Sequence, residues 1–242
     1  MAHDYRRLAV AIAGLWLFAA GPARPADDSK PHLAFLSADE LQPALILPSP
    51  PPASSPEAAR EVDELRQIAS RTTAERRAQA QWDNDNEDGT IFQSAIAPSF
   101  DLASLPATAK LLAEVRNEEA VAGGMAKSYF KRDRPWVLDP ALKTCSREDA
   151  PQTSYPSGHA TMAYAMAVVL AKAMPDIAPQ LLRRARDYSE SRLVCAAHFR
   201  SDIVAGQELG AAVAVLLLRD SRFQADLQAA EAELRVAHLI AK

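Results

Sequence analysis

The sequence predicts an all-α fold: a single-domain helical bundle around a central buried helix, preceded by an extended proline-rich N-terminal arm. Apolar residues recur at helical spacing over most of the chain after Pro56, and no alternating β-branched run of strand length interrupts them. With 242 residues, 48% of them hydrophobic, the chain can bury one full-sized core, so one domain is expected.

Residues 1–26 have the pattern of a secretory signal peptide. Arg6-Arg7 form a positively charged start, Leu8–Ala20 an apolar stretch, and small residues near Ala26 offer a cleavage site. The apolar stretch is shorter than the roughly 20 residues that cross a bilayer, although an uncleaved anchor or a buried helix stays an alternative. We therefore expect a periplasmic or secreted protein without stable membrane insertion.

Residues 27–56 are rich in proline, which lacks the amide donor and the backbone freedom that helices and sheets need. Apolar patches at 33–36 and 45–47 predict that this arm lies against the core of the all-α domain, residues 57–242. The net charge of −4 provides no basic field that would favour nucleic acid, so no nucleic-acid partner is expected.

Helices in this domain are predicted from apolar periodicity and from residues that cap or break a helix. Ser55 is the N-cap of the first and Pro56 lies in its first turn. Gly123-Gly124 is expected to end the second helix, and Pro135 to stop the third. The segment 203–218 is strongly apolar, although Gln207 and Glu208 interrupt it, and is the predicted central helix. The predicted helices span residues 57–72, 105–122, 125–133, 157–173, 177–196, 202–218 and 224–240.

The segment Asp83–Gly89 is a run of acidic and amide residues that resembles a calcium-binding loop. The glutamate that would complete such a loop is not in place, so a solvated turn is expected instead. The sequence contains no other cluster of metal ligands, and neither a metal site nor a cofactor is predicted.

Three segments of the C-terminal half carry residues that suit phosphate chemistry. In the first, Lys127 and Arg134 are seven residues apart, which on a continuous helix places both on one face. A phosphate monoester is a dianion, and lysine with bidentate arginine is a common way to bind one. Alone, such a pair is more often a solvated surface stripe.

The second segment, Pro156-Ser157-Gly158-His159, begins an apolar helix. Unpaired backbone N–H groups and the positive end of the helix dipole favour an anion there, and Gly158 permits close approach. The alternative is that Ser157 is an ordinary N-cap and His159 a first-turn polar residue.

The third segment contains Ser191-Arg192, His198 and Asp202. His198 and Asp202 have the i,i+4 spacing at which a carboxylate can hydrogen-bond an imidazole on the same helix. That pairing would fix one tautomer and leave the other ring nitrogen bare as a nucleophile or base, although a purely structural bond is the alternative. Arg192 would be out of phase with His198 on a continuous helix, so a break is expected near Ala196-Ala197.

Joined together, these segments resemble the acid phosphatase and vanadium haloperoxidase superfamily, which includes the type 2 phosphatidic acid phosphatases. Within it the chain looks most like the secreted bacterial class A non-specific acid phosphatases. The positions that match the pattern are Lys127, Arg134, Pro135, Pro156, Ser157, Gly158, His159, Ser191, Arg192, His198 and Asp202. The resemblance implies an acid phosphatase of broad specificity that hydrolyses small-molecule phosphate monoesters without a metal.

The resemblance also implies a role for each residue. His198 would form a phosphohistidine intermediate, Asp202 would hold its imidazole, and His159 would protonate the leaving group. The phosphate-binding residues would be Lys127, Arg134, Ser157, Gly158 and Arg192. Relatives are commonly homo-oligomers, so a homo-oligomer is expected.

The only two cysteines are Cys145 and Cys195. In a secreted chain an even pair suggests a disulfide, which here would tie two catalytic segments together. Two separate buried thiols are the alternative.

Two other functions remain open. A vanadate-dependent haloperoxidase is one, because the same residues can hold vanadate; the chain length and the Lys127–Arg134 spacing favour the phosphatase. A non-catalytic phosphate or phospholipid binder is the other, although binding alone needs neither a nucleophile nor an acid. A membrane lipid phosphatase is disfavoured because no segment after the signal peptide is long and apolar enough to span.

Overall fold

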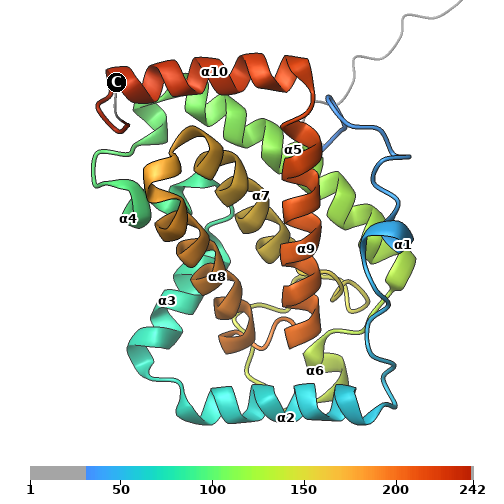
Figure 1. Cartoon of the computed structure of the whole chain (residues 1–242). Coiled ribbons are helices and arrows are strands. Elements are labelled where there is room, and N and C mark those ends of the chain that lie inside the picture. Colours follow the sequence, from blue (N-terminus) through green and yellow to red (C-terminus); the bar gives the residue numbers. More distant parts are fainter. Residues whose placement is uncertain (1–30, 241–242) are drawn as a thin grey trace, which may run out of the picture. The chain divides into compact units, whose positions relative to one another are not determined.

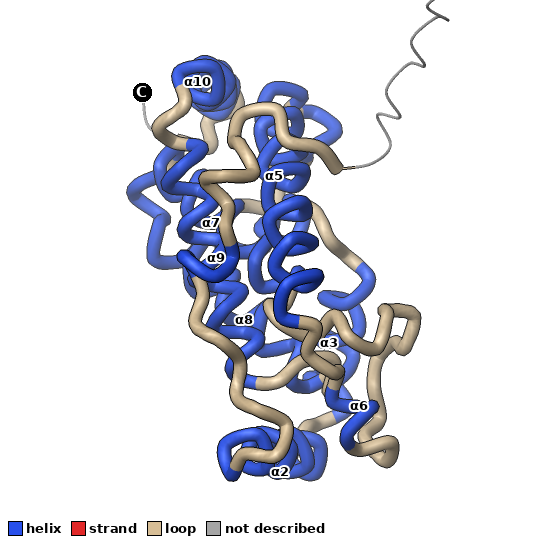
Figure 2. Tube along the Cα trace, turned by 90° about the vertical axis from the view of Figure 1, so that its right-hand side faces the viewer, coloured by secondary structure: helices blue, strands red, loops and turns tan. Residues whose placement is uncertain are grey.

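The computed structural model describes residues 31–240, so the predicted signal peptide lies outside the described residues. All regular structure in this range is helical (Figure 1), which confirms the all-α prediction. The α-helices are α1 (Pro43–Ile46), α2 (Pro56–Arg71), α3 (Ala74–Asp85), α4 (Gln93–Ile96), α5 (Pro106–Phe130), α6 (Pro135–Leu138), α7 (Gly158–Ala173), α8 (Ala178–Val194), α9 (Arg200–Leu217) and α10 (Ser221–Val236). Short 3-10 helices η1 (Gly89–Phe92), η2 (Leu102–Ser104) and η3 (Pro175–Ile177) connect them. These helices form a bundle. Figure 1 shows α2 lying across one end of it and α10 across the other, and Figure 2 shows both of them end-on.

The central helix is α7. Eleven of its 16 residues are buried, and it contacts α5, α8 and α9. In α9 nine of 18 residues are buried, while Val204 and Val215 are 44% and 55% exposed. The prediction that 203–218 is the central helix is therefore wrong, because apolar composition does not reveal which faces of a helix its neighbours cover.

Two glycines of α9 allow it to approach α7 very closely. A Cβ on Gly206 would meet the Ser157 carbonyl oxygen at 2.6 Å, and one on Gly210 would meet that of Thr161 at 2.3 Å. The two glycines are four residues apart and so share one face of α9. This contact brings the first turns of α7 and α9 together, where the Ser157 N–H donates to the Asp202 carbonyl oxygen at 3.0 Å.

α5 is a single helix of 25 residues, where the sequence predicted two. It passes through Gly123-Gly124, and among the described residues no glycine has a positive φ. A glycine inside a helix costs about 1 kcal/mol, which the packing of α5 against α7, α9 and α10 outweighs. The helix ends instead at Lys131, whose left-handed backbone (φ 48°) forms the C-cap.

The described part of the proline-rich arm lies along the helices and forms only the single turn α1. Glu118 of α5 accepts hydrogen bonds from the backbone N–H groups of Ala34 and Phe35, at 2.6 and 2.8 Å. Farther along, the Pro48 carbonyl oxygen accepts a hydrogen bond of 2.6 Å from the Tyr155 hydroxyl. The arm therefore contacts the segment that leads into α7.

Between residues 31 and 240, no single helix has the length and hydropathy of a membrane span. The pair α9 and α10 meets that criterion only when joined, and the two helices are bent by 95°. Burial of much of α9 against α7 explains its apolar composition.

Candidate active site

The break between α8 and α9 sets the position of His198. The chain leaves α8 at Cys195, turns through Ala196 with a φ of 45°, and enters α9 after Phe199. The sequence predicted this break. It allows Arg192, at the end of α8, and His198 to be buried in the same region, close enough for the Arg192 charge to lower the pKa of His198.

The tautomer of His198 follows from its two neighbours. Its Nδ1 lies 2.7 Å from the carbonyl oxygen of Ser154, which can only accept, so Nδ1 carries the proton. Nε2 is left with a free lone pair and lies 3.2 Å from Nη1 of Arg134, which can only donate. Burial, and then the Arg134 charge, lower the pKa of His198 well below 6.5, so the ring is neutral.

Asp202 does not make the predicted direct hydrogen bond to His198 on a shared helix. His198 precedes the N-cap of α9. The Asp202 carboxylate lies 3.5 Å from Nδ1, farther away than the Ser154 carbonyl oxygen. The carboxylate instead accepts from the Ser154 hydroxyl at 2.6 Å and from the Phe199 N–H at 2.8 Å. Asp202 therefore fixes the residue that orients His198.

Arg132 is the ionic partner of Asp202. Its Nη1 lies 2.5 Å from Asp202 Oδ1, and its Nη2 lies 2.6 Å from Glu61 on α2. Burial raises the pKa of Asp202 to about 6, against the opposing effect of Arg132. No sequence pattern indicates this pair, because Glu61 is distant in the chain and Arg132 lies between motif residues.

Lys127 and Arg134 converge, but not along one helix face. Lys127 is in the last turn of α5, whereas Arg134 has extended backbone and is the N-cap of α6. The predicted shared face is therefore wrong. Lys127 Nζ nevertheless reaches the start of α7, since a Cβ on Gly158 would lie 3.2 Å from it, and Arg134 contacts His198.

The cations at this site are unusually buried. Arg134 and Arg192 are 1% and 2% exposed, and burial lowers the pKa of both, that of Arg134 to about 10. Burial also lowers the pKa of Lys127. The Nε of Arg192 is buried without a hydrogen-bond partner among the described residues. Burying charged donors is costly unless an anion compensates them, so the arrangement favours binding of an anion.

The start of α7 adds neutral donors. Ser157 is the N-cap, and its hydroxyl oxygen accepts from the Ala160 N–H at 3.4 Å. Gly158 opens the helix beside Lys127, so its N–H belongs to the unpaired first turn. A helix N-terminus together with three cations is suited to the oxygens of a phosphoryl group.

His159 lies in the first turn of α7 and stacks on the Tyr188 ring, with centroids 5.7 Å apart. Its Nε2 lies 3.3 Å from the Asn84 carbonyl oxygen and 3.3 Å from a Glu87 carboxylate oxygen. Burial, and then the Arg192 charge, lower the pKa of His159 well below 6.5. The ring is therefore neutral in the empty site, although the Glu87 carboxylate lies nearby.

The polar segment that begins at Asp83 forms one wall of the site. Asp83 is fully buried and accepts hydrogen bonds from Ser191 and from Arg184. Asn84 Oδ1 accepts from Arg192 Nη1 at 2.7 Å. The predicted solvated turn is therefore wrong for Asp83 and Asn84, which belong to α3 and face the site, whereas Glu87 and Asp88 lie in an exposed loop as expected. Neither α3 nor this contact was predicted. The only signal was a high density of acceptor side chains, which does not distinguish a solvated loop from a buried one.

Cys145 and Cys195 form a disulfide, with Cα atoms 4.9 Å apart. The Cys145 N–H also donates to the Cys195 carbonyl oxygen at 3.3 Å. Both contacts join the loop after α6 to the loop that carries His198.

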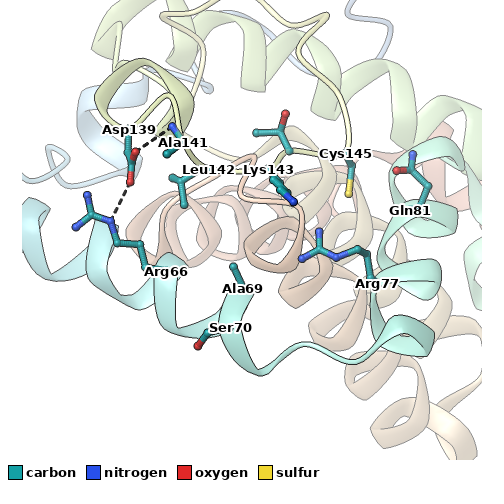
Figure 3. Close-up of a pocket in the computed structure, with 11 residues that line it drawn as sticks. Arg66, Ala69, Ser70, Arg77, Gln81, Asp139, Ala141, Leu142, Lys143 and Cys145 are labelled. Atoms are coloured by element: carbon teal, nitrogen blue, oxygen red, sulfur yellow. Dashed lines mark hydrogen bonds and ion pairs between the residues drawn. The ribbon is translucent and has the colours of Figure 1, made fainter.

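Cys145 also lines a separate cavity of about 790 Å³ (Figure 3), where Arg66 is paired with Asp139. This cavity contains none of the predicted catalytic or phosphate-binding residues. Its lining residues are Arg66, Ala69, Ser70, Arg77, Gln81, Asp139, Ala141, Leu142, Lys143, Thr144 and Cys145.

Comparison with known proteins points to one family. The PAP2 superfamily matches residues 108–225. An acid phosphatase of Zymomonas mobilis subsp. mobilis is 32% identical over 202 residues, which cover 81% of this chain and 76% of that protein. A non-specific acid phosphatase of Providencia stuartii is 28% identical over 239 residues, which cover 93% of this chain and 96% of that protein.

A solved structure supports the same fold. The crystal structure of LpxE from Aquifex aeolicus matches with a TM-score of 0.53 and 21% sequence identity, over 66% of this chain and 95% of that chain. At this identity the likeness concerns the fold alone.

Proposed function

Because the chain belongs to the PAP2 superfamily, we propose that it is an acid phosphatase that hydrolyses small-molecule phosphate monoesters with broad specificity. One observation carries the proposal: the bare Nε2 of His198 lies against Arg134, and the charges of Arg192 and Lys127 act on the same ring. A nucleophile beside compensating positive charge is what attack on a phosphoryl dianion requires.

The first step would be phosphoryl transfer to His198. Its Nε2 lone pair forms the N–P bond while the bond from phosphorus to the leaving oxygen breaks, and His159 gives its proton to that oxygen. The equatorial oxygens would be held by Lys127, Arg134 and Arg192, with the Ser157 hydroxyl and the Gly158 N–H. Positioning and charge compensation supply most of the catalysis in phosphoryl transfer.

The second step would release phosphate. Water attacks phosphorus as His159, now neutral, takes a proton from it, and the N–P bond breaks to restore His198. The phosphohistidine carries positive charge on its imidazole. Asp202 supports that charge through its negative field and by fixing Ser154, to which the Nδ1 proton is donated.

The depressed pKa of His159 is compatible with its role as an acid. In the empty site burial and the Arg192 charge disfavour its protonation. A bound phosphoryl dianion adds negative charge and reverses this effect, so the substrate complex binds the proton that catalysis needs. We therefore expect the highest activity in the acidic range.

We further propose that catalysis needs no metal ion, since three cationic side chains would supply the charge compensation. The enzyme would be periplasmic or secreted as a homo-oligomer, with residues 1–26 as the signal peptide, 27–56 as the arm and 57–242 as the catalytic domain. The apolar start of the chain and the cysteine pair support export.

Hydrolysis of a chromogenic phosphomonoester across pH tests this proposal. Activity should peak below neutral pH, vanadate should inhibit it as a mimic of the five-coordinate transition state, and EDTA should leave it unchanged. Loss of activity on chelation, with recovery on adding zinc or magnesium, would contradict the metal-free mechanism. Vanadate-dependent oxidation of bromide by hydrogen peroxide, without phosphatase activity, would instead support the haloperoxidase alternative.

A further inference from the structure

Two carboxylates contact the proposed catalytic groups from the solvent side. Glu87 lies 3.3 Å from Nε2 of His159, and Asp149 lies 3.1 Å from Nη2 of Arg134. The side chains of Glu87 and Asp149 are 43% and 52% exposed, whereas those of His159 and Arg134 are 11% and 1% exposed. The carboxylates come from separate loops, before η1 and between α6 and α7, and lie between the buried groups and solvent.

Neither carboxylate is fully compensated by a cation of its own. Glu87 pairs with Arg116 at 2.6 Å, but Arg116 also pairs with the buried Glu119. Within the described part of the chain, Asp149 has only Arg134 as a partner, and Arg134 is a proposed phosphate ligand. Once a phosphoryl group takes Arg134, Asp149 keeps its negative charge at the edge of the site.

The leaving group must pass close to Glu87. For His159 to protonate it, the leaving oxygen must lie about 3 Å from Nε2. Since Glu87 lies 3.3 Å from the same nitrogen, the leaving oxygen comes within about 6 Å of the Glu87 carboxylate, and the first substituent on that oxygen within about 8 Å. The charge of the leaving group is therefore sensed at short range.

We propose that Glu87 and Asp149 form an acidic rim that selects substrates by the charge of the leaving group. This inference rests on the proposed phosphatase function. Monoesters whose alcohol is neutral or carries an ammonium group are favoured, and those whose leaving group is a carboxylate or a second phosphate are disfavoured. Like charges at this separation repel, and a rim that repels the wrong substrate gives specificity without weakening the shared phosphoryl site.

The test is kcat/KM for three monoesters that share the phosphoryl group: O-phosphoethanolamine, glycerol 2-phosphate and 3-phosphoglycerate. We expect the wild-type enzyme to prefer them in that order. Glu87→Gln and Asp149→Asn together should lower the ratio of the first to the last about tenfold. All three leaving groups are unactivated alkoxides, so any effect of Glu87→Gln on the acidity of His159 is similar for the three substrates and largely cancels in the ratio.

Glu148→Gln is the matched control, since Glu148 is an exposed carboxylate next to Asp149 without contact to the site cations. It should leave the ratio unchanged. Sodium chloride should reduce the wild-type preference by screening, which checks the electrostatic origin without any substitution. Suppose that all three monoesters are hydrolysed but neither the double substitution nor salt alters the ratio. That result would overturn the proposed acidic rim and leave the phosphatase proposal standing. Failure to hydrolyse any monoester would overturn both.

Discussion

The backbone carbonyl of Ser154 lies 2.7 Å from Nδ1 of His198 and orients its imidazole. The Asp202 carboxylate, which the motif suggests as the direct partner, is 3.5 Å from Nδ1 and instead binds the Ser154 hydroxyl. The carboxylate thus acts on the histidine by charge and through one intervening residue. Loss of its charge and loss of the serine hydroxyl should therefore have different consequences.

Ser154→Ala should destabilise the protein more clearly than it impairs catalysis. The substitution keeps the carbonyl that orients His198 but removes a buried hydrogen bond to Asp202, which costs about 1–3 kcal/mol. Asp202→Asn should lower kcat at least tenfold more than Ser154→Ala (roughly 1.4 kcal/mol), because it removes the negative charge that faces the phosphohistidine. Urea unfolding and kcat on a chromogenic phosphomonoester measure the two effects. Equal losses of kcat in two folded variants would contradict this division.

The two histidines should differ in their substrate dependence. His198→Ala should abolish turnover of every substrate, because no other group can accept the phosphoryl group. His159→Ala should spare an activated aryl phosphate far more than an alkyl phosphate, since a general acid contributes about 10²–10⁴-fold when the departing oxygen is strongly basic. Steady-state rates on a matched pair of aryl and alkyl phosphates measure the difference.

Rapid quench with labelled substrate separates the same roles directly. The His159 variant should trap label on the protein, and the His198 variant should trap none. Label on His159 or Ser157 would reverse the assignment of nucleophile and acid.

His159 and His198 should each lower the stability of the ligand-free protein as the pH is lowered through about 6.5. The folded pKa of His159 and that of His198 lie well below 6.5, so only the unfolded chain binds protons there. Each histidine then lowers the free energy of unfolding by up to about 1.4 kcal/mol per pH unit. Two buried carboxyl groups have the opposite effect, Asp202 between its raised pKa of about 6 and its ordinary 3.8, and Glu119 between its raised pKa of about 7 and its ordinary 4.5. Urea unfolding from pH 7.5 to 5 should show a shallower slope for His159→Gln, and an identical slope would contradict the buried neutral state.

Loss of the disulfide should lower both stability and activity. The bridge closes a loop with a sequence separation of 50, for which the chain-entropy argument gives about 4 kcal/mol. It also ties down the loop that carries His198. Replacing both cysteines by serine should lower the melting temperature and kcat, and peptide mass spectrometry without reduction should find the crosslink in the wild type. Two free thiols in protein from an oxidising compartment would refute the pairing.

The sequence predicted helix ends correctly where a capping or helix-breaking residue favours the same end as the tertiary packing. Ser55 is an N-cap as predicted, Ser157 is an N-cap as the alternative interpretation of its segment had it, and the predicted break near Ala196 is present. The helix end predicted at Gly123-Gly124 is wrong. Each glycine destabilises a helix by only about 1 kcal/mol, which is less than the stabilisation from long-range packing of α5. The seven-residue spacing also predicted correctly that Lys127 and Arg134 serve one site, but for a wrong reason. They do not share a helix face, because α5 ends and the chain turns between them.

The sequence by itself determined the all-α class and the set of residues that could bind and cleave a phosphate ester, because helical periodicity and side-chain chemistry are local properties. Only the tertiary structure decided that α7 is central, that Ser154 orients His198, and that Asn84 and Glu87 border the site. These contacts join residues far apart in the chain. They depend on how closely helices approach, as at Gly206, and on which polar groups burial leaves in need of a partner.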